Sequence, residues 1–335
     1  MTNESAQTKT DYVWQPLAML ESGYYPAAIC LTKSNQLFAA TWNPVAKTGY
    51  LQRWSVSQSK WLPVVGLYFK SQINQMCCDT LGNIYLVGDT NALGNYVISI
   101  YNATNGWSFV DNGYKVPINY ICCDTNNNVY VTGNFIDTNN NFSVMQYNLG
   151  QNKWTQLTGS GFNQPLSGLC LNPSNTLFAL EVALNQEVSI SYWNGQKWFS
   201  FTSPNMQTAT GIGCDNSGNV FFNSSSSIWS YNLLLKQYTD LKAPIQTFSG
   251  TVVFTNFFYI DNILYFSISG YTDTGATACY VWVYSNNTWT DITPSNINEN
   301  NNAVIYDIAC YTGKSHNIIL GTNLNKAYDG KQLIH

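Results

Sequence analysis

The chain carries very little charge, and this excludes one large class of function. Among its 335 residues, Asp, Glu, Lys and Arg together make up only 10%, the formal net charge is −4, and Arg53 is the single arginine. Nucleic-acid binding needs several cations that follow the phosphate backbone. We therefore expect no nucleic-acid partner. Neutral polar side chains must provide solubility instead, and the sequence contains 42 asparagines.

Long apolar runs are also absent. No stretch approaches the roughly 18 consecutive apolar residues of a membrane-spanning helix, so we expect no membrane insertion. Residues 1–10 lack the basic region and the apolar run of a cleavable secretion signal, and we expect them to form a disordered tail. The sequence thus predicts a cytoplasmic protein, with export without a cleavable signal as the open alternative.

Catalytic and metal-binding side chains are scarce. The only histidines are His316, in or beside a predicted turn, and His335, whereas Ser/His/Asp and Cys/His catalysis both need a placed imidazole. No loop has calcium-binding spacing, and no His or Cys cluster has the spacing of zinc or iron ligands. We expect no catalytic residues, no metal and no cofactor, although paired carboxylates leave an enzyme possible in principle.

A repeat organises the whole chain. One series of aromatic or apolar anchors recurs at intervals of 43 to 53 residues: Phe38, Tyr85, Tyr130, Phe178, Phe221, Tyr265 and Ile318. A second series follows it within each repeat: Trp61, Trp107, Trp154, Trp198, Tyr238 and Trp289. A repeat of this length, built from short β segments, is typical of one propeller blade, with the second series packing at the blade edge. We predict an all-β fold, a seven-bladed β-propeller of four-stranded antiparallel blades.

Asx and glycine turns divide each repeat into four strands. The blades are expected near residues 24–66, 73–113, 118–159, 166–203, 209–242, 249–294, and 303–335 plus 11–18, forming a single domain over 11–335. The last repeat has only three strands of its own. Because residues 14–17 resemble the outer-strand segments 61–64 and 154–157, we expect the N-terminal strand to join the C-terminal blade and close the ring.

The nine cysteines keep step with the repeat, since most lie seven or eight residues before the first anchor. A residue that recurs at one repeat position fills one structural slot, so we interpret the cysteines as buried free thiols in a reducing compartment. Asp79, Asp124 and Asp215 likewise recur at one turn position. We interpret them as Asx caps of a hairpin rather than as catalytic carboxylates.

Two families of propeller are similar to parts of the repeat. Residues 79–85, 124–130 and 215–221 resemble the turn and second strand of NHL-type propellers. Tyr101 before Trp107 is similar to the Tyr and Trp of kelch repeats, although residues 86–89 stand where a kelch repeat has a Gly-Gly doublet. The resemblance implies a propeller used for protein interaction, a fold that also has enzymes and lectins among its members.

The longer loops, which join strands two and three and link one blade to the next, should all emerge on one face, which we call the long-loop face. Eleven aromatic residues fall in or beside these loops: Tyr24, Tyr25, Trp42, Tyr50, Tyr68, Phe69, Tyr114, Phe135, Phe162, Phe248 and Tyr271. Some should cap the contacts between blades and a few should be free to bind. We expect the binding residues to come from Trp42, Tyr68, Phe69, Tyr114, Phe162 and Phe248.

Two interpretations of this face remain open. Exposed aromatic side chains with few charges suit a protein or peptide partner, bound by a monomeric, non-catalytic protein. They also suit a glycan, because aromatic stacking and polar hydrogen bonds bind sugars. A lectin would be indicated by one aromatic and polar set repeated in every blade, whereas the loops here differ in length and content. A propeller lyase with a histidine acid/base, or a sialidase with several arginines, would lack its essential groups.

Overall fold

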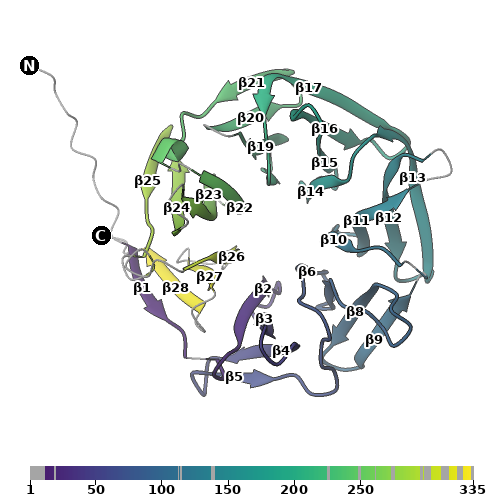
Figure 1. Cartoon of the computed structure of the whole chain (residues 1–335), viewed down its shortest axis with the longest axis vertical. Coiled ribbons are helices and arrows are strands. Elements are labelled where there is room, and N and C mark those ends of the chain that lie inside the picture. Colours follow the sequence, from purple (N-terminus) through teal and green to yellow (C-terminus); the bar gives the residue numbers. More distant parts are fainter. Residues whose placement is uncertain are drawn as a thin grey trace, which may run out of the picture.

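The computed structural model describes residues 12–18, 20–111, 113, 115–136, 140–224, 227–247, 250–260, 262–272, 276–294, 297, 303–310, 317–322 and 327–332. These residues form seven four-stranded antiparallel sheets that stand radially around a central channel, so the protein is an all-β propeller (Figure 1). Within the described ranges, no helix is long and apolar enough to cross a membrane.

The sheets follow one another along the chain, with the inner strand first. They contain β2 (Tyr25–Leu31), β3 (Leu37–Asn43), β4 (Thr48–Ser55) and β5 (Lys60–Pro63); β6 (Gln75–Cys78), β7 (Ile84–Val87), β8 (Val97–Asn102) and β9 (Gly106–Asp111); β10 (Ile118–Cys123), β11 (Asn128–Ile136), β12 (Phe142–Asn148) and β13 (Lys153–Phe162); β14 (Leu166–Leu171), β15 (Leu177–Val182), β16 (Glu187–Trp193) and β17 (Trp198–Gln207). Next come β18 (Ile212–Cys214), β19 (Asn219–Asn223), β20 (Ile228–Asn232) and β21 (Gln237–Asp240); a 3-10 helix, η1 (Pro244–Thr247); β22 (Gly250–Ile260), β23 (Ile263–Thr272), β24 (Thr277–Ser285) and β25 (Thr288–Asp291); and β26 (Ile305–Cys310), β27 (Asn317–Thr322) and β28 (Ala327–Gln332).

The N-terminal strand closes the ring. β1 (Tyr12–Pro16) pairs antiparallel with β28, with Trp14 opposite Gly330 and Pro16 opposite Tyr328. The last sheet therefore has the order β1-β28-β27-β26, and both ends of the chain meet in one sheet (Figure 1). This pairing confirms the closure predicted from the outer-strand pattern of residues 14–17, and it covers the edge that β28 would otherwise expose.

The core is a set of layers between neighbouring sheets. Each buried apolar cluster combines residues of two adjacent sheets; Leu51 of β4 packs in one cluster with Ile84 of β7, for example, and Tyr265 of β23 packs with Ile318 of β27. The repeat anchors Tyr85, Tyr265 and Ile318 are fully buried. The anchor series therefore marks the second strand of each sheet, where a side chain can contact a neighbouring sheet.

The second series packs at the outer edge and ties one sheet to the previous one. The Trp107 indole donates to the Val65 carbonyl (3.0 Å), and the equivalent indoles of Trp198 and Trp289 donate to the carbonyls of Leu157 (3.2 Å) and Leu241 (2.7 Å). This confirms the interpretation of the tryptophans as packing residues. Each hydrogen bond gives the packed indole N–H an acceptor in place of water.

The recurring aspartates cap hairpins, as predicted. Asp79 accepts hydrogen bonds from the amides of Leu81 and Asn83 through Oδ1, and from the Asn83 side chain and the Tyr85 hydroxyl through Oδ2. Asn83 in turn accepts from the side chain of Asn102 (2.7 Å). The same hydrogen-bonded Asp–Asn–Asn chain recurs at Asp124, Asn128 and Asn148, and at Asp215, Asn219 and Asn232. A good part of the asparagine content is therefore structural.

Candidate functional site

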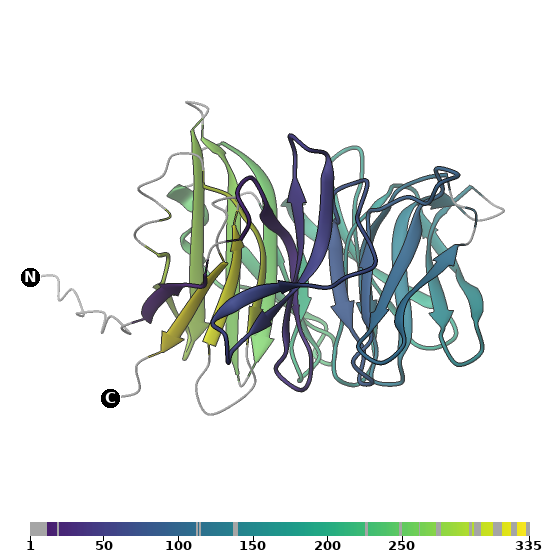
Figure 2. The same cartoon turned by 90° about the horizontal axis from the view of Figure 1, so that it is seen from below.

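The connections between strands emerge on two opposite faces of the ring (Figure 2). One face carries the Asx-capped turns between first and second strands, which also hold one another: the Thr80 hydroxyl donates to Asn127 Oδ1 in the next sheet (2.6 Å). The other is the long-loop face, with connections such as residues 64–74 between β5 and β6. The long-loop face carries the longer, irregular connections, and it is the candidate face for a partner.

Two of the predicted binding residues are buried, which corrects the sequence-based expectation. Trp42 is 9% exposed and Phe69 is 1% exposed. The backbone of Phe69 pairs with Gly49, with the Phe69 amide donating to the Gly49 carbonyl (2.7 Å), and its ring meets the ring of Trp107 edge-on at 6.2 Å. This pairing directs the Phe69 side chain into the apolar layer between the first two sheets. Phe69 therefore caps the contact between these sheets, and Trp42 is buried in β3.

Phe162 is also buried, at 1% exposure, and does not lie in a loop. The connection expected over residues 159–166 is largely strand, because β13 continues to Phe162, which pairs with Phe142 across a register shift. Its ring contacts the Trp198 ring at 5.2 Å. Tyr114 and Phe248 lie outside the described residues. Of the six predicted binding residues, Tyr68 is the one that the structure shows exposed, at 70%.

Tyr68 belongs to a cluster on the long-loop face of the first sheet. The ring of Tyr50 contacts the ring of Tyr24 at 5.0 Å and that of Tyr68 at 6.2 Å, with interplanar angles of 64° and 66°. The Tyr50 hydroxyl donates to Glu21 Oε2 (2.9 Å), and the Tyr24 amide donates to the Glu21 carbonyl (3.0 Å). Three rings and one carboxylate are thus brought together by the segment before β2, by strand β4 and by the loop between β5 and β6.

A second pair of rings lies beside this cluster, across the seam where the ring of sheets closes. Tyr25 of β2 stacks on Tyr306 of β26, with centroids 5.0 Å apart and an interplanar angle of 13°. Tyr306 lies at the register shift between Ile305 and Asp307 in the pairing of β26 with β27. A β-bulge of this kind redirects a side chain. Tyr25 also donates through its hydroxyl to Gln72 Oε1 (3.1 Å) in the loop before β6.

We call the five tyrosines of these two groups the tyrosine platform: Tyr24, Tyr25, Tyr50, Tyr68 and Tyr306. Sequence reasoning named the first four among the loop aromatics but missed Tyr306 and Glu21. Tyr306 sits inside a strand, and a bulge leaves no mark in the sequence. Glu21 is one of the few acidic residues and lies next to the Tyr24-Tyr25 pair, which is the signal that could have found it.

The electrostatics of the platform are acidic. Burial is the main cause that raises the pKa of Tyr24 and of Tyr50, and the charge of Glu21 raises the pKa of both further. For Tyr50, the hydrogen bond to Glu21 acts in the same direction. The platform therefore keeps neutral, hydrogen-bonding tyrosines around one carboxylate.

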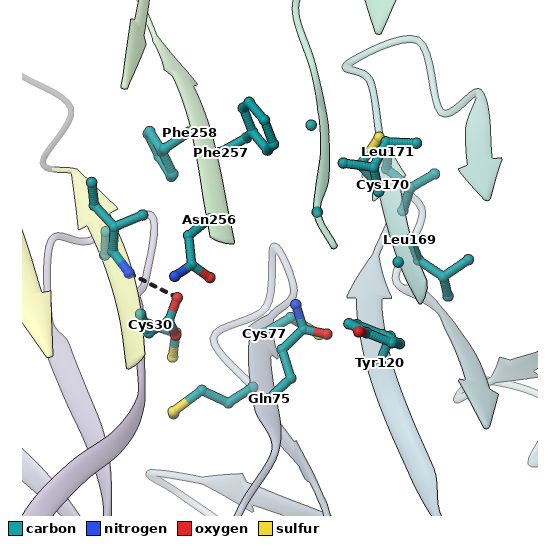
Figure 3. Close-up of a pocket in the computed structure, with 18 of the residues that line it drawn as sticks. Cys30, Gln75, Cys77, Tyr120, Leu169, Cys170, Leu171, Asn256, Phe257 and Phe258 are labelled. Atoms are coloured by element: carbon teal, nitrogen blue, oxygen red, sulfur yellow. Dashed lines mark hydrogen bonds between the residues drawn. The ribbon is translucent and has the colours of Figure 1, made fainter. Parts of the chain in front are cut away.

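The central channel is the second concave feature. A cavity of about 690 Å³ is lined by all seven inner strands. Figure 3 shows Gln75, Tyr120 and Asn256 directed into it. Some of its polar side chains satisfy backbone groups on the open edge of an inner strand: Gln75 Oε1 accepts from the Ile121 amide (2.7 Å), and Asp307 Oδ2 accepts from the Ile29 amide (2.9 Å). Burial raises the pKa of Asp307 to about 7. These hydrogen bonds connect neighbouring sheets.

Cysteine thiols from neighbouring sheets also line the channel. Hydrogen-bond contacts join Cys30 to Cys78, Cys77 to Cys123, and Cys170 to Cys214. The eight cysteines whose side chains are described are free and buried or half-buried. In the described part of the chain, no group of three or more His, Cys, Asp or Glu side chains could hold a metal ion.

Comparison with known proteins supports the propeller fold and no specific function. The sequence matches no known protein family and no curated protein. Among solved structures, the chain is similar to a catalytically inactive virginiamycin B lyase from Staphylococcus aureus with quinupristin (TM-score 0.70, 16% identity, 97% of this chain and 100% of that chain covered). It is also similar to YCF48 bound to D1 peptide (0.66, 13%, 96% and 95%) and to a chain of the mitotic checkpoint complex (0.67, 10%, 100% and 97%). At these identities, the likenesses establish the propeller architecture.

Proposed function

We propose that this protein is a non-catalytic interaction protein that binds a protein or peptide partner on the tyrosine platform of its long-loop face. The observation that carries the proposal is the platform itself: Tyr50 contacts Tyr24 and Tyr68, Tyr25 stacks on Tyr306, and Tyr68 is 70% exposed. Tyrosine is enriched at protein interfaces because its ring offers apolar contact area and its hydroxyl offers a hydrogen bond.

The fold neighbours support a partner of this class. One of them is bound to a peptide and another belongs to a multiprotein complex. A lyase is also among them, which keeps an enzyme in view. The buried carboxylate of Asp307, however, is occupied by two backbone amides, those of Ile29 and Ile308, which favours a structural role for it.

A glycan is the second candidate, because the platform also combines rings with polar groups, Glu21 and Gln72. A propeller lectin can repeat one such site in every blade. Here the platform draws on the first sheet, the closing sheet and the loop before β6, so it forms one composite site. A single composite site favours a peptide.

The test is selection from a phage-displayed random peptide library, run beside a glycan array on the same protein. We expect selected peptides whose binding falls at least about tenfold in the Tyr25→Ala/Tyr68→Ala double variant. The matched control is Leu234→Ala, because Leu234 is 89% exposed in the turn between β20 and β21, on the opposite face. Equal losses in the control, or glycan binding without peptide binding, would refute the proposal.

A further inference from the structure

We propose that the tyrosine platform recognises an arginine side chain of its partner, held against the ring of Tyr68 and paired with the carboxylate of Glu21. This inference rests on the proposed function, because it names the chemistry that the partner brings to the same face. It follows from the way in which Tyr24, Tyr50, Tyr68 and Glu21 are arranged.

The three rings present π faces in more than one direction. Tyr50 lies between the other two and meets each at a steep angle, 64° for Tyr24 and 66° for Tyr68. Tyr24 and Tyr50 are half-buried and fixed, whereas Tyr68 projects into solvent. An aromatic face attracts a cation through its quadrupole, and several faces at one point strengthen the attraction.

Glu21 supplies the charge that a neutral aromatic patch would lack. Its Oε2 atom accepts the hydrogen bond from the Tyr50 hydroxyl at 2.9 Å, while the described contacts leave Oε1 available to accept a second donor. The Tyr24 amide bonds to the Glu21 carbonyl, so the backbone that carries the carboxylate is held beside the rings. The carboxylate is therefore placed by the cluster and exposed to solvent on its other side.

Charge complementarity identifies the occupant. Glu21 is the ionic group that acts on both Tyr24 and Tyr50, and among the described residues no Lys or Arg forms an ion pair with its carboxylate. A cation from a partner would balance this charge. A guanidinium group suits the site better than an ammonium group, because it is planar, stacks on an aromatic ring and donates several N–H groups in a fixed fork.

The experiment uses small probes, so that it does not depend on an identified partner. The full-length protein, carrying ¹³C-labelled tyrosine rings, is titrated by NMR with N-acetyl-arginine methylamide and, separately, with N-acetyl-citrulline methylamide. Citrulline has nearly the same shape but no charge. We expect saturable shifts with the arginine probe only, weakened about fivefold or more by Glu21→Gln and by Tyr68→Ala.

Two controls separate binding from folding. Glu21→Gln keeps an acceptor for the Tyr50 hydroxyl and removes only the charge. Glu187→Gln removes one exposed carboxylate elsewhere, on β16, and should leave the titration unchanged. Thermal melts of all variants establish that each is folded. Equal shifts from the citrulline probe, or arginine shifts that survive both platform variants, would overturn the inference.

The peptides selected for the proposed function give an independent readout. Peptides enriched in arginine, whose arginine-to-citrulline forms bind about tenfold more weakly, support the inference. Peptides that lack arginine but still require Tyr25 and Tyr68 overturn it and leave the proposed function intact. Peptides insensitive to the platform variants refute the proposed function instead.

Discussion

Tyr306 stacks on Tyr25 across the seam at which the propeller closes, with the two rings 5.0 Å apart and 13° from parallel. The first ring belongs to β26, in the last sheet, and the second to β2, in the first. The Tyr25 hydroxyl also donates a hydrogen bond to Gln72 Oε1 (3.1 Å). One run of contacts therefore links the last sheet, the first sheet and the loop that enters the second, and the same rings form part of the candidate binding surface.

The stacked pair should stabilise the closed ring. In a double-mutant cycle with Tyr25→Ala and Tyr306→Ala, we expect a coupling of about 0.5–1.5 kcal/mol in the free energy of unfolding, as is usual for an aromatic pair. Urea denaturation measures it. Tyr25→Phe, which keeps the ring and loses the hydrogen bond to Gln72, should retain most of the coupling. A coupling free energy of zero would show that the stacked pair does not stabilise the closed ring.

Removing β1 should lower stability sharply. Deletion of residues 1–20 removes the strand that pairs with β28 and also Leu20, which is 4% exposed in the cluster with Ile29 and Ile319. We expect a fall in Tm of several degrees or more, because an edge strand and a core contact are lost together. The matched deletion of residues 1–9 should change Tm little. An unchanged Tm in the longer deletion would show that β1 is dispensable.

Asp307 should make the protein more stable as pH falls from 8 towards 5. Burial raises the pKa of this carboxyl from 3.8 to about 7, so between these values the native state binds a proton that the unfolded chain does not. Stability from this group is therefore gained as pH falls through 7, by about 2–3 kcal/mol at pH 5 relative to pH 8. Urea midpoints measured at each pH test this.

Asp307→Asn provides the control for that pH dependence. The amide oxygen can still accept one of the two backbone bonds from Ile29 and Ile308, but the side chain no longer titrates. We expect the variant to lose this part of the pH dependence. If wild type and variant change in parallel between pH 5 and 8, the titration belongs to another group.

Cys78 should be the most reactive thiol among the described cysteines. A hydrogen bond from the Cys30 thiol lowers the pKa of Cys78, whereas burial raises the pKa of Cys77, Cys122 and Cys123. Reactivity follows the thiolate fraction and access. Brief alkylation of the native protein at pH 8, followed by peptide mass spectrometry, should label Cys78 first. Cys30→Ser keeps a hydroxyl that can donate to Cys78, so it should leave that order intact. Labelling of Cys122 before Cys78 would contradict the prediction.

The Asx cap at Asp79 should matter for stability and not for binding. Asp79→Ala leaves the amides of Leu81 and Asn83 and the Tyr85 hydroxyl without their acceptor in a buried turn. We expect a loss of about 2–4 kcal/mol in the free energy of unfolding. Asp79→Asn should cost less, since its oxygen can keep the two amide bonds, as Asn172 accepts from the Thr176 amide in the fourth sheet. Peptide binding on the long-loop face should be unchanged.

The sequence alone determined the architecture and much of the packing. The aromatic and tryptophan series recur because each sheet must offer the same apolar contact to its neighbours, so a repeated physical demand leaves a repeated pattern. The Asx turns were also readable, because Asp79, Asp124 and Asp215 cap turns through bonds to residues two to four positions away. The match of residues 14–17 to an outer strand disclosed the closure of the ring.

The candidate binding surface, in contrast, was decided by tertiary structure. Tyr68 and Phe69 are consecutive aromatics in one loop, yet the pairing of Phe69 with Gly49 buries one ring and exposes the other. Phe162 looked like a loop residue until β13 extended to include it. Tyr306 lies at a register shift in β26 and stacks on Tyr25, and these residues, 281 positions apart in the chain, meet only because the ring closes. A local pattern reports which contacts a residue can make, but exposure depends on which distant segments arrive beside it, and that is fixed only when the sheets are assembled.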